Sequence, residues 1–176
     1  DEIKENKDYE VLDEIPFWAN GQGFTNKKRT HLVSLDLESK EYSRVIEDEY
    51  DIISFDLLGD KVCLNMSKYS DKADLKSGLY LYDLEKDYLE QLTEENMSLG
   101  FVKFKDKDTV YFSATDMEEM GVNTNRDIFA VDLTDKKVEQ LTDNLDKSLW
   151  VSVGNDSRLG SGKMNEFADD EFYFIT

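Results

Sequence analysis

The sequence contains few of the side chains that enzymes use as bases and nucleophiles. It has one histidine, His31, and one cysteine, Cys63. A serine hydrolase needs a base with a pKa near neutrality, usually histidine, and the G-x-S-x-G turn that often carries the nucleophile does not occur in this sequence. We therefore expect His31 to be a surface or half-buried strand residue and Cys63 to pack in a strand core. No catalytic residue is predicted.

Motifs for cofactors and metals are incomplete. The run 160–163, GSGK, resembles part of a phosphate-binding loop. The pattern G-x-x-x-x-G-K-[ST], however, requires a glycine where this chain has Ser157 and a serine or threonine where it has Met164. One cysteine and one histidine cannot form a usual zinc site within this chain. The acidic turns 106–108 and 143–146 lack the glycine and the later glutamate of a calcium loop. We predict no cofactor and no metal.

Adjacent carboxylates occur at Glu118-Glu119 and Asp169-Asp170. Such pairs are common where 35% of residues are charged, and neighbours on one strand point to opposite faces. In a loop, however, a glutamate pair can hold the amino terminus of a substrate by charge-assisted hydrogen bonds. This hypothesis stays open, and no binding residue is assigned.

The elements that would position these side chains are organised as repeats. Residues 79–93, LYLYDLEKDYLEQLT, recur at 128–142 as IFAVDLTDKKVEQLT. Asp83 and Asp132 are 132 − 83 = 49 residues apart, and the same frame reaches Asp36 after 83 − 36 = 47 residues. A period of this length is typical of propeller blades, which bury their faces against neighbouring blades.

Apolar alternation predicts about four strands per repeat, the content of one blade. The predicted fold is therefore all-β, a partial β-propeller with about three four-stranded antiparallel blades plus the start of another. We expect one domain over 1–176, with repeats near 29–66, 78–114 and 127–176 after a lead-in strand and turn at 1–28. The polar segments 67–77 and 115–125 are interpreted as crossings between blades. The insertion 154–170 is expected to project from one face.

Charge and hydropathy restrict the partners. The chain has 40 acidic and 21 basic residues, a net charge of −19, which repels phosphate backbones and anionic membrane surfaces. We predict no nucleic acid and no membrane as a partner. No leader or membrane-spanning run is visible, so a cytoplasmic location is predicted. Both ends are expected to be cut from a longer protein, and the uncovered blade edges predict self-association.

The repeat ending resembles a known family. The pattern D-[IL]-[FY]-x-x-D-L followed by Q-L-T, as in Asp127 to Leu133 and Gln140 to Thr142, resembles the propeller repeat shared by TolB and the prolyl oligopeptidase family. The segment 15–24, IPFWANGQGF, followed by Arg29 and Leu32, is similar to the start of a blade in acylaminoacyl-peptidase-like members. The insertion also resembles that branch at Asp156 to Gly160.

The resemblance covers most of the chain, from about Tyr9 to Thr176, with one departure. Blades of this family often carry S-P-D-G between their third and fourth strands. The matching turns here read Leu58-Gly59-Asp60-Lys61 and Lys105-Asp106-Lys107-Asp108. The turn is retained while its residues differ, which leaves the subfamily open.

The resemblance implies a serine peptidase made of an amino-terminal propeller and a carboxy-terminal α/β-hydrolase domain that carries serine, aspartate and histidine. This chain would then be a non-catalytic propeller segment that gates the access of short peptides to a hydrolase domain outside it. Its expected partners are that domain and short peptides. The alternative is a free-standing TolB-like propeller acting as a protein-binding module. A third hypothesis is a sensor of small ligands at the loop 154–170.

Overall fold

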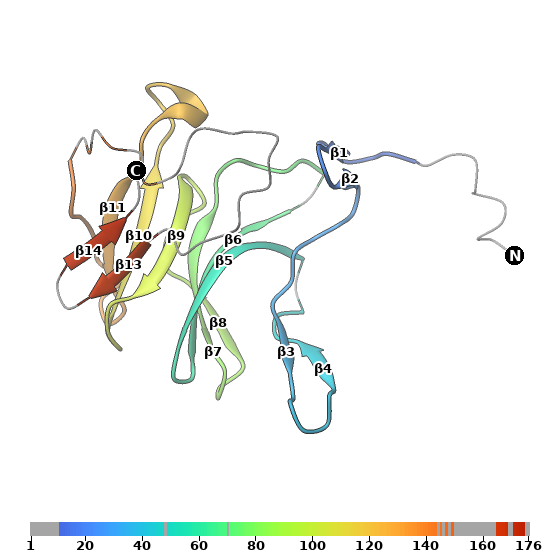
Figure 1. Cartoon of the computed structure of the whole chain (residues 1–176), viewed down its shortest axis with the longest axis horizontal. Coiled ribbons are helices and arrows are strands. Elements are labelled where there is room, and N and C mark those ends of the chain that lie inside the picture. Colours follow the sequence, from blue (N-terminus) through green and yellow to red (C-terminus); the bar gives the residue numbers. More distant parts are fainter. Residues whose placement is uncertain are drawn as a thin grey trace, which may run out of the picture. The chain divides into compact units, whose positions relative to one another are not determined.

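The computed structural model describes residues 11–47, 49–69, 71–143, 145, 147, 149, 165–168 and 171–174. The chain divides into two compact units, which are residues 1–53 with 66–75 and residues 54–65 with 76–176. Apart from the 3₁₀ turn η1 (Gly121–Asn123), the regular elements of the described residues are β-strands (Figure 1). The predicted all-β class is therefore confirmed.

The first unit contains two short antiparallel hairpins. Their strands are β1 (Trp18–Ala19) with β2 (Gly23–Phe24), and β3 (Val33–Leu35) with β4 (Tyr42–Arg44). Gly21 lies in the first turn with a φ of 78°, a conformation that glycine adopts without a steric penalty. The rings of Trp18 and Phe24 meet edge to face with their centroids 5.3 Å apart. The tight turn predicted in the lead-in is thus present.

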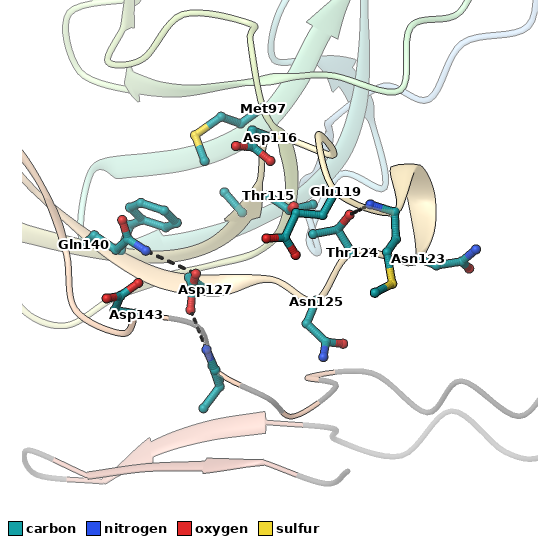
Figure 2. A pocket seen from close by; sticks show the side chains of 14 residues that line it. Met97, Thr115, Asp116, Glu119, Asn123, Thr124, Asn125, Asp127, Gln140 and Asp143 are labelled. Carbon is teal, nitrogen blue, oxygen red and sulfur yellow. Dashed lines mark hydrogen bonds between the residues drawn. The ribbon is translucent and has the colours of Figure 1, made fainter.

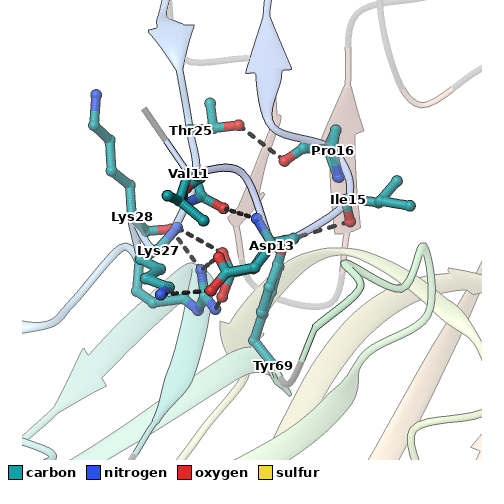
Figure 3. A network of polar contacts seen from close by, with 11 residues as sticks. Val11, Asp13, Ile15, Pro16, Thr25, Lys27, Lys28 and Tyr69 are labelled. Carbon is teal, nitrogen blue, oxygen red and sulfur yellow. Dashed lines mark hydrogen bonds and ion pairs between the residues drawn. The ribbon is translucent and has the colours of Figure 1, made fainter. Parts of the chain in front are cut away.

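A buried ion pair holds the segment before β1. Arg29 donates two hydrogen bonds to Glu14, of 2.5 and 3.1 Å, and the main-chain N–H of Lys27 donates to the same carboxylate at 2.5 Å. The Arg29 guanidinium lies 3.3 Å from the ring centroid of Tyr69, a cation–π contact. Figure 3 shows the neighbouring ion pair of Asp13 and Lys27, at 2.6 Å. These side-chain contacts act together with a parallel bridge between Ile15 and Lys72, in which Ile15 N–H donates to Asp71 O at 3.0 Å and Ala73 N–H donates to Ile15 O at 2.8 Å.

Two four-stranded sheets follow, each with its strands paired in chain order (Figure 1). The first consists of β5 (Tyr50–Leu58), β6 (Lys61–Lys68), β7 (Gly78–Asp83) and β8 (Tyr88–Gln91). The second consists of β9 (Ser98–Phe104), β10 (Thr109–Thr115), β11 (Asp127–Asp132) and β12 (Val138–Gln140). Four strands joined in order make one propeller blade, as the sequence predicts.

The two polar segments interpreted as crossings between blades instead connect neighbouring strands of the same sheet. Residues 67–77 join β6 to β7, and residues 115–125 join β10 to β11, and both pairs of strands are neighbours in one sheet. The interpretation as crossings is therefore wrong. The repeat length gives the spacing between equivalent strands, but it does not say which four consecutive strands pair to form one sheet. Each observed sheet combines the last two strands of one sequence repeat with the first two of the next.

The repeated aspartate is a turn residue. In each copy its Oδ1 atom accepts hydrogen bonds from the main-chain N–H groups two and three residues later, at distances between 2.7 and 3.4 Å. The fourth residue after each aspartate has a positive φ, namely 64° at Lys40, 51° at Asp87 and 60° at Lys136. The sequence period is thus the spacing of three equivalent hairpin turns, at β3–β4, β7–β8 and β11–β12.

The core of the second unit lies between its two sheets. It is formed by the buried side chains of Cys63, Leu79, Leu92, Leu99, Val102, Val110, Phe112, Ala114 and Val131. Phe112 stacks on Phe129 with ring centroids 5.4 Å apart. Cys63 is fully buried, as expected, and this burial raises the pKa of its thiol. A thiol in such surroundings is an inert core residue.

Polar side chains of β5 and β6 tie the first sheet to strand β9 of the second. Asp56 on β5 accepts a hydrogen bond from the main-chain N–H of Phe104 on β9 at 2.9 Å. The fully buried Asn65 on β6 donates to the carbonyl oxygens of Leu99 and Gly100 at 3.2 and 3.0 Å. These bonds satisfy main-chain groups of β9 that strand pairing leaves free.

Strand β9 carries a bulge that requires glycine. The pairing register between β9 and β10 shifts between Phe112 and Ala114, so Gly100 and Phe101 both oppose Ser113. The N–H of Phe101 donates to Ser113 Oγ at 3.2 Å. A Cβ atom on Gly100 would lie only 2.4 Å from that oxygen. The bulge therefore depends on the missing side chain at Gly100.

A third, two-stranded sheet packs on the second four-stranded sheet. It consists of the antiparallel strands β13 (Asn165–Ala168) and β14 (Glu171–Phe174). Strand β14 fits the predicted last strand, whereas β13 lies within the insertion 154–170, which the sequence predicts to project as a loop. The contact is an aromatic cluster of Phe101, Tyr111, Phe167, Phe172 and Phe174. Its ring centroids lie 4.8 Å apart for Tyr111 and Phe167 and 5.1 Å apart for Phe101 and Phe172. The two elements thus meet through ring contacts.

Candidate functional site

A pocket of about 490 Å³ opens in the second unit, where β10 ends and β11 begins (Figure 2). Its lining comes from three parts of the chain: the residue before β9, the end of β10 with the following loop and the start of β11, and the end of β12 with the chain after it. The residues are Met97, Ala114, Thr115, Asp116, Glu119, Met120, Asn123, Thr124, Asn125, Asp127, Phe129, Gln140, Asp143 and Leu145. This volume lies within the range of about 300–1,000 Å³ that is usual for small-molecule sites.

The lining is acidic. Four carboxylates contribute to it, from Asp116, Glu119, Asp127 and Asp143, and no lysine, arginine or histidine belongs to the described lining. Amide and hydroxyl side chains supply most of the other polar groups. Such a surface attracts a positively charged group and offers it hydrogen-bond acceptors.

Asp127 is the structural centre of the pocket wall. Its carboxylate accepts hydrogen bonds from the Thr142 hydroxyl at 2.9 Å, the Gln140 amide at 3.1 Å and the main-chain N–H of Leu145 at 3.1 Å. Figure 2 shows the bond from Gln140. Thr142 Oγ1 in turn accepts from the N–H of Ile128 at 2.9 Å. Asp127 therefore fixes the chain after β12, and its carboxylate is largely engaged.

The same arrangement explains the repeat ending Q-L-T. In the preceding repeat, Thr93 Oγ1 accepts from the N–H of Leu79 at 2.9 Å, as Thr142 does from Ile128. Gly78 stands where the later repeat has Asp127. A Cβ atom at Gly78 would lie 3.1 Å from the carbonyl oxygen of Thr93, so a larger side chain there would require its neighbours to shift by a few tenths of an ångström. The carboxylate of Asp127 thus has no counterpart at this position of the first sheet.

The loop between β10 and β11 presents two of the other carboxylates, Asp116 and Glu119. Its backbone is held locally, because Asp116 accepts from the N–H of Glu118 at 2.9 Å and Thr124 Oγ1 accepts from the N–H of Met120 at 2.9 Å. Met117 has a φ of 66°, which turns the chain sharply after the strand. Glu119 lines the pocket and is exposed to solvent, so its carboxylate is available to a ligand.

The carboxylate pairs singled out in the sequence have different outcomes. Of Glu118 and Glu119, only Glu119 lines the pocket. Asp169 and Asp170 lie outside the described residues, as do Gly160 to Lys163 and residues 154–164 of the insertion. In the sequence, Asp127 is named only as the first residue of the repeat pattern and Asp143 only as the first residue of the acidic turn 143–146, and Asp116 is not singled out. None of the three is expected from the sequence to line a pocket. The sequence repeat does not indicate them, because the pairing of β10 with β11 in one sheet brings these residues together.

The other candidate residues have structural partners. His31 is half-buried, as expected, but it lies before β3 and not in a strand, and its Nδ1 atom lies 2.8 Å from a guanidinium nitrogen of Arg44. In the acidic turn 106–108, Asp106 accepts from the N–H of Asp108 at 2.9 Å. Across the described part of the chain, no group of three histidine, cysteine, aspartate or glutamate side chains is placed to hold a metal ion.

The sequence matches one family over most of its length. The family is described as the Dipeptidyl peptidase IV (DPP IV) N-terminal region, and the match covers residues 24–161. The chain belongs to this family. All residues that line the pocket, from Met97 to Leu145, belong to the region that matches the family. A search of curated proteins found no match.

Solved structures support the fold of this DPP IV N-terminal family chain. A puromycin-hydrolyzing peptidase from Mycobacterium tuberculosis has a TM-score of 0.52 and 18% identity, covering 68% of this chain and 18% of its own. A putative TolB from Agrobacterium tumefaciens has a TM-score of 0.51 and 17% identity, covering 64% of this chain and 40% of its own. The chain thus spans less than half the length of either structure, and it shares with them a partial propeller fold. Among its described residues, no helix is long and apolar enough to cross a membrane.

Proposed function

We propose that this chain is the non-catalytic propeller segment of an acylaminoacyl-peptidase-like serine peptidase. In this proposal it limits access to a hydrolase domain of the same polypeptide, so that short peptides reach the catalytic groups and longer ones do not. The segment itself provides walls and binding groups and contributes none of the bond-breaking side chains. A cytoplasmic location goes with the proposal and remains a prediction.

The observation that carries the proposal is membership of a family named for the N-terminal region of a peptidase. The resemblance of residues 15–24 to the start of a peptidase blade supports the branch. The acidic pocket supports contact with peptides, because its carboxylates would attract an amino terminus or a basic side chain. Polar bonds between the two four-stranded sheets would give the wall the stiffness that exclusion by size requires.

The first experiment reads the coding sequence after Thr176. The proposal expects a G-x-S-x-G turn followed by aspartate and histidine within roughly one domain length, on the order of 200 residues. A stop codon, or further blades and then a stop codon, would refute the peptidase and favour a free-standing propeller that binds proteins.

The second experiment tests size selection in the full-length protein. Hydrolysis rates are measured for peptides of increasing length with the same cleavable bond. Asp56→Ala removes the acceptor for the N–H of Phe104 and should loosen the contact between sheets, raising the rate on long peptides relative to short ones. Asp108→Ala, a matched control on an exposed turn, should leave the ratio unchanged. Equal rates on short and long peptides in the unmodified enzyme would contradict gating and leave the family assignment intact.

A further inference from the structure

Arg126 is a half-buried cation immediately before β11. Its Nε atom donates to the carbonyl oxygen of Ser98 at 3.4 Å, and its Nη2 atom donates to the Ser98 hydroxyl at 3.1 Å. Among the described residues it has no carboxylate partner. Burial lowers the pKa of the guanidinium, and no neighbouring acid opposes that effect. The charge is therefore partly removed from water without an anion beside it.

Two other cations of the chain differ from Arg126 in having an acidic partner. Acidic residues outnumber basic ones by 40 to 21. Arg29 pairs with the buried Glu14, and Lys61 pairs with the buried Asp83. A buried charge without a counter-ion destabilises a fold, since the lost hydration is not replaced. An external anion at Arg126 would supply the missing interaction.

The surroundings of Arg126 combine hydroxyl groups with an aromatic surface. A Cβ atom on Gly100 would lie 3.2 Å from Arg126 Cδ and 2.4 Å from Ser113 Oγ, so the guanidinium stem and that hydroxyl are close together. Tyr111 lies two residues before Ser113 on β10 and therefore faces the same side of the sheet. Tyr111 contacts Phe167 at 4.8 Å between centroids, which places the aromatic cluster on the side of Arg126.

We propose that Arg126 binds the carboxylate of a small monocarboxylate ligand whose apolar part lies against the aromatic cluster. The planar guanidinium matches a carboxylate with two parallel hydrogen bonds. A multiply charged anion such as a phosphate is disfavoured by the net charge of −19. The proposal is independent of the peptidase assignment and of the acidic pocket.

The test is a titration of the ¹⁵N-labelled chain followed by NMR. The probe is 3-phenylpropanoate, and its matched control is 3-phenylpropanamide, which has the same ring and no charge. Saturable shifts are expected at the main-chain amides of Gly100, Phe101 and Ser113, with binding at least about tenfold weaker for the amide. Equal shifts with both compounds, or no saturable shift with the acid, overturn the proposal.

Substitutions then locate the site. Arg126→Gln keeps a donor for Ser98 and should weaken binding of the acid by about tenfold. The control Lys28→Gln removes the same charge from an exposed position in the other unit and should leave binding unchanged. Where Arg126→Gln loses its folded spectrum, Arg126→Lys replaces it and should weaken binding several-fold, because an ammonium lacks the planar fork. Unchanged affinity in either folded variant at 126, or equal losses in the variants at 28 and 126, overturns the assignment.

Discussion

Glu119 gives the most direct test of the acidic pocket at the scale of single residues. We expect Glu119→Gln to weaken binding of alanyl-alanine amide, a cation with a free amino terminus, by about two- to fivefold, the effect of an exposed ion pair of roughly 0.5–1 kcal/mol. The measurement is an NMR titration of the chain. The reason is that Glu119 is an exposed carboxylate of the lining.

Glu118 supplies the control, since it adjoins Glu119 and is absent from the described lining. Glu118→Gln removes the same charge and should have a smaller effect on the same titration. Equal losses for both variants would mean that the ligand senses only the net charge of the chain. The acetylated form of the probe should bind weakly to every variant.

Asp83 links stability to pH. Lys61 forms an ion pair with its buried carboxylate, and Lys86 lies 3.0 Å away, so the pKa of Asp83 is held far below its usual range in the folded chain. An unfolded aspartate titrates near pH ~3.9. The ion pair therefore stabilises the fold above about pH 4, and the stabilisation is lost as the pH falls toward the folded-state pKa.

Urea unfolding of wild-type and Asp83→Asn chains at pH 7 and pH 3 checks this linkage. The variant should be less stable at pH 7 and should lose less of its free energy of unfolding on acidification. Asp108→Asn, on an exposed turn, should retain the wild-type dependence on pH. Parallel losses in the wild-type and Asp83→Asn chains would show that other carboxylates control acid unfolding.

At the scale of elements, the β9 bulge predicts a strong effect of one methyl group. Gly100→Ala should destabilise the second unit by about 1–3 kcal/mol, the usual cost of overpacking, because the new Cβ meets Ser113 Oγ. Thermal or urea unfolding of the chain measures the change. Ser113→Ala alone should cost about 1 kcal/mol, since the N–H of Phe101 loses its acceptor.

The two substitutions should not be additive. In Gly100→Ala with Ser113→Ala, the oxygen that the new methyl group meets is gone, so the double variant should be more stable than the sum of the single effects predicts. Strict additivity would mean that the bulge relaxes away from Ser113 in the single variant. The requirement for glycine at position 100 would then come from another contact, for example with the Arg126 side chain.

At the scale of the whole molecule, strand β12 predicts self-association. It ends the second four-stranded sheet, and its described residues, Val138 among them, are exposed. An unpaired strand edge is a template for another chain. Sedimentation equilibrium should show a mass that rises with concentration, and Val138→Lys should reduce the association because a charge on an edge opposes pairing. A monomer at all concentrations would contradict this prediction.

Several features of this molecule follow from local sequence patterns. The alternating apolar residues of 109–115 predict a strand because side chains of a strand point to opposite faces in turn. Asp36, Asp83 and Asp132 mark equivalent turns because an aspartate can accept hydrogen bonds from its own chain two and three residues later. Such interactions span a few residues, so they can be read from the chain in order, and they suffice for the all-β class and the four-stranded blades.

The remaining features depend on contacts between residues that are distant in the sequence. Hydrogen bonding between strands decides which four strands form each sheet, so that 67–77 and 115–125 connect neighbouring strands of one sheet. It also brings Asp116, Asp127 and Asp143 to one pocket and places Arg126 beside Gly100. Local propensity does not encode which loops meet at the end of a sheet, because that depends on strand register and packing. For this reason the pocket and the proposed carboxylate site became visible only in the folded chain.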